Sequence, residues 1–176
     1  KLNIKFLSSA FSIADAKLLV NIGCKDVKIP SFESRNIELI EYCDKNFETI
    51  IMSCGTSTFE EISKSVSKIQ NANLYLMHCV SVYPGEYNKA NLPKMKLLRQ
   101  LSSNVGLSDH IEGVESSKIA IGEGAVIIEK HFTIDKSLPG RDNKFAILPE
   151  ELSNLTNFIK NRLEMLTDKG SGFNDM

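Results

Sequence analysis

Short apolar runs recur along the chain at intervals of roughly 20 to 30 residues, and each is followed by polar residues and a segment with helical periodicity. The runs are Ile4–Leu7, Val27–Ile29, Thr49–Met52, Leu74–Met77, Val105–Leu107 and Val126–Ile128. Runs this short have the length of buried β-strands, and their alternation with amphipathic segments is typical of successive βα units. The sequence therefore predicts an α/β protein built on parallel strands.

One of the intervening segments begins with two overlapping capping-box patterns. Ser57 precedes Glu60 by three residues, and Thr58 precedes Glu61 by the same spacing. In a capping box the hydroxyl and the carboxylate each accept a hydrogen bond from the other residue's backbone N–H. The pattern predicts a helix start here and leaves open which pair forms the cap.

Polar residues follow every apolar run, which bears on the choice between two parallel-sheet folds. A doubly wound sheet gathers its ligand contacts at one topological switch point, whereas a TIM barrel gathers them from the carboxyl ends of all its strands. The polar residues at the ends of the runs are Ser8, Ser9, Lys28, Ser31, Glu33, Ser53, His78, Ser81, Tyr83, Ser108, Asp109, His110, Lys130 and His131. This distribution favours a (β/α)8 TIM barrel.

The chain is short for a complete barrel. Its 176 residues compare with about 250 in a typical TIM barrel, and it has six apolar runs where eight strands are needed. The chain also begins at Lys1, directly before a run. We expect a fragment with about six of the eight βα units, residues 1–167 forming the partial barrel and residues 168–176 a Gly-rich linker or tail.

The charge pattern argues against two classes of partner. The net charge is −1, and the lysines do not gather on one face as they do in nucleic-acid-binding proteins. No run approaches the roughly 18 apolar residues of a membrane span, and the N-terminus lacks a signal-peptide pattern. We expect a cytoplasmic protein whose partners are small molecules.

The cysteines show no CxxC pair and no metal-finger spacing. We interpret Cys24, Cys43, Cys54 and Cys79 as reduced thiols packed as small apolar side chains. Cys54 and Cys79 follow strand ends, so each is a candidate to line the mouth of the barrel.

Two histidines follow the last two apolar runs at matching positions. If these runs are neighbouring parallel strands, His110 and His131 point into the same mouth. Two imidazoles beside hydroxyl, carboxylate and ammonium groups favour a divalent metal site. The third histidine, His78, has no evident acidic partner, and a structural role is favoured for it.

A lysine interrupts the apolar run Val27–Ile29. Lysine is rarely buried without a partner, so Lys28 indicates an anionic ligand inside the barrel. Ser9, Ser31 and Ser53 follow neighbouring strands and complete a plausible anion cradle, although a serine in this position also serves as a helix cap. No Walker A or GxGxxG pattern is present.

The loop after the last run ends in Arg141-Asp142 and is expected to fold over the mouth. The sequence leaves two roles open for Asp142, binding a polyol or completing a turn. It also leaves two roles open for Arg141, contacting a carboxylate or phosphate or facing solvent.

Seven segments, in order and at suitable separations, resemble motifs of the sialic acid synthases, including the pseudaminate and legionaminate synthases. They are Phe6-Leu-Ser-Ser-Ala-Phe11, Lys28-Ile-Pro-Ser-Phe-Glu33, Ile51-Met-Ser-Cys-Gly55, His78-Cys-Val-Ser-Val-Tyr-Pro84, Gly106-Leu-Ser-Asp-His110, Ile128-Glu-Lys-His-Phe-Thr133 and Pro139-Gly-Arg-Asp142. The resemblance implies a TIM-barrel enzyme of carbohydrate and cell-surface polysaccharide biosynthesis. Enzymes of this family condense phosphoenolpyruvate with the open-chain aldehyde of an N-acylated hexosamine, forming a nine-carbon 2-keto acid and phosphate, and the resemblance implies the same reaction here.

The resemblance also implies roles for individual residues. His110 and His131 match the metal ligands, with Mn²⁺ the usual ion and Mg²⁺ or Co²⁺ as alternatives; with Lys28 they form the expected catalytic set. The phosphoenolpyruvate side is matched by Lys28, Ser9, Ser31, Ser53 and Ser81, and the sugar side by Glu33, Tyr83 and Asp142. A homodimer is expected for the full-length protein.

Several positions depart from the family pattern. Ser81 stands where some members have Asn, Ser9 where Thr is common, and Arg141 where many have Pro. The family's catalytic Glu in the first βα unit and its antifreeze-like C-terminal domain have no match here, so we expect this chain alone to be inactive.

Two other functions are compatible with the sequence. One is another phosphoenolpyruvate-using barrel, of the 3-deoxy-keto-acid-phosphate synthase type, for which Arg141 is the candidate second phosphate contact. The other is a non-catalytic module that binds sugar phosphates or assists assembly.

Overall fold

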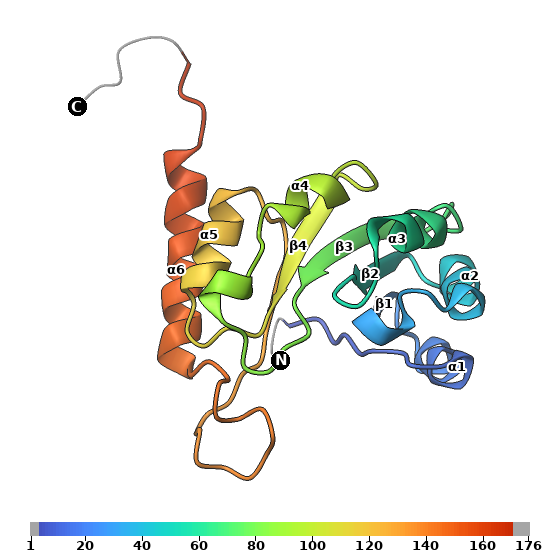
Figure 1. Ribbon diagram of the computed structural model, residues 1–176, viewed down its shortest axis with the longest axis horizontal. Helices are drawn as coiled ribbons and strands as arrows, with labels where there is room; N and C mark the ends of the chain where they lie inside the picture. The colour runs from blue at the N-terminus through green and yellow to red at the C-terminus, as the bar shows by residue number, and fades with distance from the viewer. Residues whose placement is uncertain (1–3, 171–176) are drawn as a thin grey trace.

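Helices and strands alternate along residues 4–170, the part of the chain that the computed structural model describes (Figure 1). In order they are α1 (Ile13–Asn21), β1 (Asp26–Ile29), η1 (Ser31–Glu33), α2 (Ile37–Asn46), β2 (Thr49–Ser53), α3 (Phe59–Val66), β3 (Asn73–Cys79), η2 (Tyr87–Lys89), α4 (Lys94–Leu98), β4 (Asn104–Asp109), α5 (Glu115–Gly122), β5 (Ile128–Lys130) and α6 (Pro149–Met165). The five strands form one parallel sheet in the order β1-β2-β3-β4-β5. This confirms the predicted fold of successive βα units.

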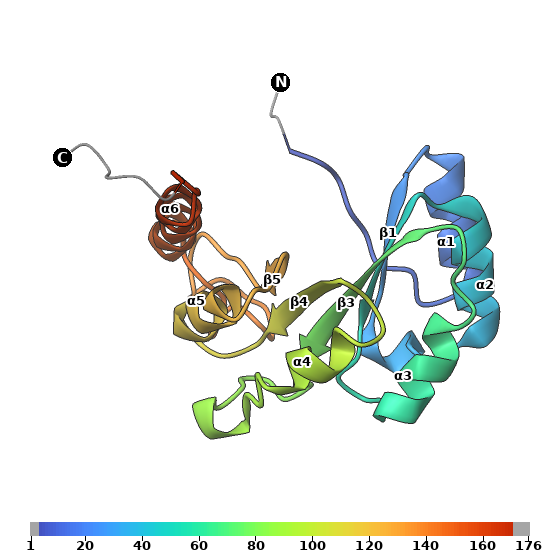
Figure 2. The same ribbon diagram turned by 90° about the horizontal axis from the view of Figure 1, so that it is seen from above.

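The sheet curves, and its helices lie along the outer side, so the molecule is a partial TIM barrel (Figure 2). Alternate strand residues point outward, because successive side chains of a strand point to opposite faces. The outward set includes Val27, Ile29, Ile50, Met52 and Leu76, all fully buried in one core with Leu39 and Ile40 of α2 and Ile62 of α3. The inward set includes the polar residues Lys28, Ser53, Ser108 and Glu129, and the parallel strands bring their carboxyl ends to one edge.

The expected strand Ile4–Leu7 does not form. The chain joins the edge of β1 only around Ser9, which makes a single parallel bridge with Lys28. The N–H of Lys28 donates to the Ser8 carbonyl at 3.0 Å, and the N–H of Ala10 donates to the Lys28 carbonyl at 2.9 Å. Ile4 remains 79% exposed, so no packing against the described residues extends the pairing toward the N-terminus.

The structure resolves the choice between the two capping boxes. Thr58 and Glu61 form the reciprocal box at the start of α3. Ser57 instead shares a hydrogen bond of 2.7 Å with the Ser34 hydroxyl, and both residues are buried. Ser57 therefore makes a tertiary hydrogen bond instead of capping α3.

The C-terminal residues bear on two further expectations. Residues 168–170 follow α6 without regular structure, and residues 171–176 of the predicted tail lie outside the described residues. Among the helices of residues 4–170, none combines the length and apolar content needed to cross a bilayer.

Asp44 near the end of α2 holds the connection between α3 and β3. Its Oδ1 accepts hydrogen bonds from the N–H groups of Gln70, Asn71 and Ala72 at 2.9–3.1 Å, and its Oδ2 accepts one from the Asn71 side chain at 2.7 Å. Burial by itself raises the pKa of Asp44, but these hydrogen bonds outweigh it and bring the pKa below its ordinary value. Asp44 is therefore ionised in the folded protein at neutral pH.

We expect Asp44→Asn to lower the free energy of unfolding by about 1–2 kcal/mol at pH 7, because charge-assisted hydrogen bonds become neutral ones and an amide NH₂ faces the Asn71 side chain. Since the pKa of Asp44 is depressed in the folded state, its contribution is present above the unfolded pKa of about 3.9 and is lost as the pH falls through the folded pKa. Urea unfolding of both proteins between pH 7 and pH 3 measures this. A difference that persists undiminished at the lowest pH would contradict the assignment.

Candidate active site

A cavity of about 370 Å³ opens at the carboxyl ends of the strands. Eight of the ten predicted site residues line it, namely Ser9, Lys28, Ser31, Ser53, Ser81, Tyr83, His110 and His131. They come from the segment before α1, from all of the strand ends and from the loops that follow them. Residues distant in sequence thus meet at the edge where TIM barrels place their ligands.

The other two predicted residues lie outside this cavity. Asp142 lines an adjoining hollow of about 580 Å³ together with Arg141 and Phe145, and Tyr83 and His131 border both spaces. Glu33 lies in η1, where its carboxylate accepts a hydrogen bond of 2.8 Å from the Asn36 side chain. Asp142 is therefore placed beside the histidine pair, whereas Glu33 is held at the start of α2.

The structure adds an acidic residue that the sequence-based site omitted. Glu129 lies in β5, and its carboxylate oxygens are 2.8 and 3.1 Å from the Lys28 ammonium across the cavity. The signal for it was available, because Glu129 precedes His131 by two positions and so shares its face of the strand. The sequence indicated an anionic ligand for Lys28, and in this structure a carboxylate of the chain itself pairs with it.

Hydroxyl groups extend this ion pair into a network. Ser108 donates to the Glu129 carboxylate, and the Ser108 and Ser53 hydroxyls are 2.8 Å apart. Burial raises the pKa of Glu129, but the Lys28 ammonium and the Ser108 hydroxyl outweigh it and hold the pKa below its usual range. Glu129 is therefore a carboxylate at neutral pH.

Ser31 is oriented by the turn after β2. Its Oγ accepts a hydrogen bond of 3.0 Å from the N–H of Gly55, which leaves its hydroxyl hydrogen free to donate. Gly55 approaches closely because it lacks a side chain; a Cβ there would lie 2.5 Å from the Ser81 Oγ. The glycine thus brings two candidate donors to one side of the cavity.

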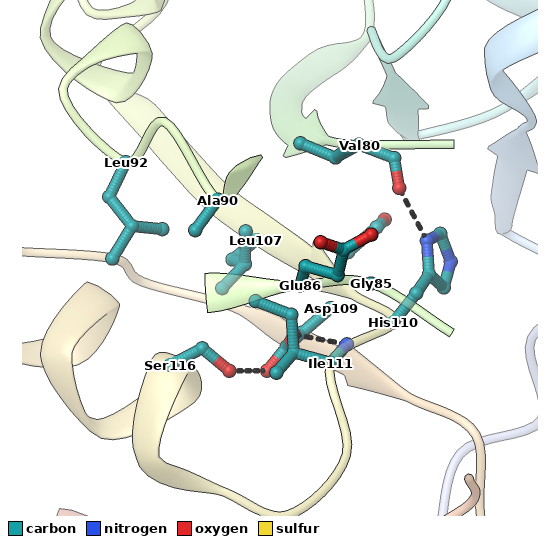
Figure 3. A pocket seen from close by; sticks show the side chains of 11 residues that line it. Val80, Gly85, Glu86, Ala90, Leu92, Leu107, Asp109, His110, Ile111 and Ser116 are labelled. Atoms are coloured by element: carbon teal, nitrogen blue, oxygen red, sulfur yellow. Dashed lines mark hydrogen bonds between the residues drawn. The ribbon is translucent and has the colours of Figure 1, made fainter. Parts of the chain in front are cut away.

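The two histidines face each other with ring centroids 5.5 Å apart. The Nδ1 of His110 lies 3.0 Å from the Val80 carbonyl oxygen, an acceptor, so Nδ1 is the protonated nitrogen and Nε2 keeps its lone pair (Figure 3). Burial lowers the pKa of His110, and the neighbouring His131 lowers it further. His110 is therefore neutral at pH 7, as a metal ligand must be.

The donor set fits a divalent metal ion. In metal-binding imidazoles the N–H of the second ring nitrogen usually donates a hydrogen bond to a carbonyl or carboxylate. Val80 provides the carbonyl for His110, and the Asp142 carboxylate lies 3.6 Å from Nδ1 of His131. Across residues 4–170 no group of three or more His, Cys, Asp or Glu side chains is arranged as a metal cage, so an ion here would rely on water or substrate for its other ligands.

The remaining candidates divide between the cavity and the packed outer layer. Cys79 lines the cavity, with its Sγ 4.0 Å from Nδ1 of His110, whereas Cys54 is fully buried in the core. His78 is 1% exposed and points away from the cavity, and its Nε2 lies 2.7 Å from the Ala90 carbonyl oxygen. The structural role favoured for His78 agrees with this position.

Comparison with known proteins places these residues in a family. Residues 1–171 match the model of the NeuB family. The chain is 36% identical to the N,N'-diacetyllegionaminic acid synthase of Legionella pneumophila, in a match that covers 97% of this chain and 49% of that protein. The chain thus spans about half the length of the curated relatives it matches.

Solved structures agree in fold. The N-acetylneuraminic acid synthetase of Leptospira borgpetersenii, solved in complex with citrate, superposes with a TM-score of 0.90 at 32% identity, covering 98% of this chain and 61% of that chain. A truncated 3-deoxy-D-arabino-heptulosonate 7-phosphate synthase from Thermotoga maritima superposes with a TM-score of 0.75 over 91% of this chain and 66% of that one. At 16% identity the second likeness reflects the shared barrel alone.

Proposed function

The chain belongs to the NeuB family, and we propose that it supplies the condensation site of a synthase that joins phosphoenolpyruvate to the open-chain aldehyde of an N-acylated hexosamine. The products are a nine-carbon 2-keto sugar acid and phosphate. One observation carries this proposal: Lys28 with its serines and the His110–His131 pair border the same cavity. A carbon–carbon condensation of an anionic donor with an aldehyde needs both halves in one place.

The part of the site around Lys28 binds phosphoenolpyruvate. The Lys28 ammonium and the hydroxyls of Ser9, Ser31, Ser53 and Ser81 are donors for its phosphate and carboxylate groups. Glu129 pairs with the Lys28 ammonium, so an incoming anion competes with this carboxylate. Binding therefore rearranges the pair, and Glu129 is released beside the bound donor.

The imidazole half binds the aldehyde end of the sugar. We assign His110 and His131 as the ligands of a divalent cation, Mn²⁺ first. When bound, this ion supplies Lewis acidity at the aldehyde oxygen. Tyr83 and Asp142 border the space beside the histidines, which supports them as our candidates for the sugar hydroxyls, and Glu33 remains a prediction for the same side.

The reaction balances with water as the third reactant. The enol carbon C3 of phosphoenolpyruvate attacks the aldehyde carbon, whose oxygen takes up a proton and becomes a hydroxyl. Water adds at C2 and loses both of its protons as the C2–O bond to phosphate breaks and the 2-keto group forms; one proton balances the new hydroxyl and the other leaves with phosphate. The Glu129 carboxylate is charged and lies in the cavity, so it is our candidate to accept a proton of that water. A homodimer and a cytoplasmic location remain predictions for the complete protein.

Metal binding by the chain itself tests the imidazole half. We expect wild-type protein to bind Mn²⁺ at least tenfold more tightly than the His110→Ala/His131→Ala variant, because two of the ligands are lost. Titration followed by the electron paramagnetic resonance of free Mn²⁺ measures both affinities. Equal affinities, with both proteins folded by circular dichroism, would remove the metal site.

The reaction is tested in a chimera in which this chain replaces the matching region of the Legionella synthase. We expect Mn²⁺-dependent release of phosphate from phosphoenolpyruvate with at least one member of a panel of N-acylated hexosamines. A folded chimera that binds Mn²⁺ and releases no phosphate with any sugar would contradict the synthase assignment. Release with sugar 6-phosphates alone would assign the phosphorylated substrates.

A further inference from the structure

We propose that the buried Asp109–Lys130 ion pair is the positioning device that sets the spacing of the two imidazoles. The inference rests on the proposed function, because it concerns the same metal site. Asp109 and Lys130 are opposite each other in the β4–β5 register, and each immediately precedes one of the histidines. Both residues border the cavity, but neither is assigned as a ligand, because their polar atoms are already bound to each other, to the Ile111 peptide groups and to two serines of α5.

The pair is deeply buried and fully partnered. The Lys130 Nζ lies 3.2 Å from the Asp109 Oδ2, and the two side chains are 6% and 2% exposed. Ser116 and Ser117 of α5 also donate to this oxygen, at 2.7 and 2.6 Å. A buried ion pair is weak evidence for stability, because desolvation offsets much of the attraction. The number of partners that hold this pair in place therefore points to a geometric role.

The pair forms hydrogen bonds with the peptide groups on both sides of Ile111. The Asp109 Oδ1 accepts the N–H of Ile111 at 3.0 Å, and the Lys130 ammonium donates to the carbonyl of Ile111. Figure 3 shows Asp109 turned toward Ser116 and the Ile111 N–H while His110 points the other way, toward Val80. The backbone that leaves His110 is thereby tied to the strand that leads into His131.

This arrangement couples the two histidines across the sheet. The β4–β5 pairing ends at Asp109 and Lys130, so beyond them no strand hydrogen bond fixes the distance between the imidazoles. The cavity beside Asp109 is about 20 Å³, which holds roughly one water and is too small for a ligand. The link between the segment after His110 and β5 is therefore made by the Asp109 and Lys130 side chains. Loss of the pair removes the side-chain link between the segment after His110 and β5, while the β4–β5 backbone pairing remains.

The test compares Mn²⁺ affinity in Asp109→Asn/Lys130→Met with that of wild type. Removing both charges together avoids an unpaired buried ion, so the double variant is expected to fold. We expect its Kd for Mn²⁺ to rise about tenfold or more, the usual effect of losing a residue that orients metal ligands. The visible absorption of bound Co²⁺ should change with it, because that spectrum reports coordination geometry.

Asp44→Asn is the matched control. It also alters a buried carboxylate that receives several hydrogen bonds, but at the end of α2 outside the cavity, so it should lower stability and leave Mn²⁺ affinity and the Co²⁺ spectrum unchanged. Should the double variant fail to fold, Ser117→Ala removes a single donor from Asp109 and should weaken Mn²⁺ binding in the same direction. Unchanged affinity and spectrum in the folded variant would overturn the inference alone, whereas failure of wild type to bind Mn²⁺ would remove the proposed function with it.

Discussion

Replacing Gly106 with alanine is expected to lower the free energy of unfolding by about 3 kcal/mol, the upper part of the range for overpacking a closely packed site. Gly106 lies in β4 opposite Met77 of β3. A Cβ at this position would lie 2.3 Å from the Ile127 carbonyl oxygen and 2.8 Å from the Met77 Sδ. The methionine can change rotamer, but the carbonyl belongs to the backbone that leads into β5, so the strands themselves must separate.

The effect should reach the candidate site, because β4 and β5 carry His110 and His131. Gly122→Ala is the matched control; nothing lies within 4 Å of a Cβ there, and it should be neutral or slightly stabilising. Urea unfolding of the three proteins gives the free energies. Similar stabilities for the Gly106 and Gly122 variants would show that the strands accommodate the methyl group.

Replacing Lys28 with methionine is expected to weaken phosphoenolpyruvate binding by about 1.5–3 kcal/mol, the range for a hydrogen bond to a charged group. This corresponds to roughly 10- to 150-fold in Kd. The Lys28 side chain is 8% exposed and paired with Glu129, whose side chain is 48% exposed. Without the lysine the anion meets an unpaired carboxylate, so loss of attraction and gain of repulsion act in the same direction.

Two controls separate binding from folding in this experiment. Lys25→Met removes the same charge from a side chain that is 70% exposed and pairs with Glu48, outside the cavity. It should leave the binding of phosphoenolpyruvate and of Mn²⁺ unchanged. Mn²⁺ affinity should stay the same in Lys28→Met, because the imidazole half is intact. Calorimetric titration with each ligand measures this, and equal weakening of phosphoenolpyruvate and Mn²⁺ binding would mean that Lys28 supports the fold instead.

Much of the candidate site followed from local sequence pattern. Strand alternation assigns one face to each residue, so His110, His131 and Lys28 could be directed into one mouth once parallel strands were inferred. The same rule applied to β5 also selects Glu129, which the predicted site omitted in favour of His131, two positions later. Its role became evident only when Lys28, 101 residues earlier in the chain, was found as its partner.

The local sequence pattern did not decide the structure where a residue could make either of two local interactions. Ser57 and Thr58 both fit a helix cap, and the choice depended on the Ser34 hydroxyl, which arrives from a different unit. The run Ile4–Leu7 has strand composition but forms no strand pairing with the described residues, and its side chains are largely exposed. Strand formation depends on a partner, which local sequence does not specify.

The sequence by itself determined the βα repeat, the polar edge at the strand ends and the residue types that gather there, because periodicity and turn chemistry are local properties. Only the tertiary structure decided which of these groups touch: Lys28 with Glu129, His110 with the Val80 carbonyl, and Asp109 with Lys130. These contacts join residues 21 to 101 positions apart. Their distances are set by strand register and sheet curvature, which arise from the packing of the whole core.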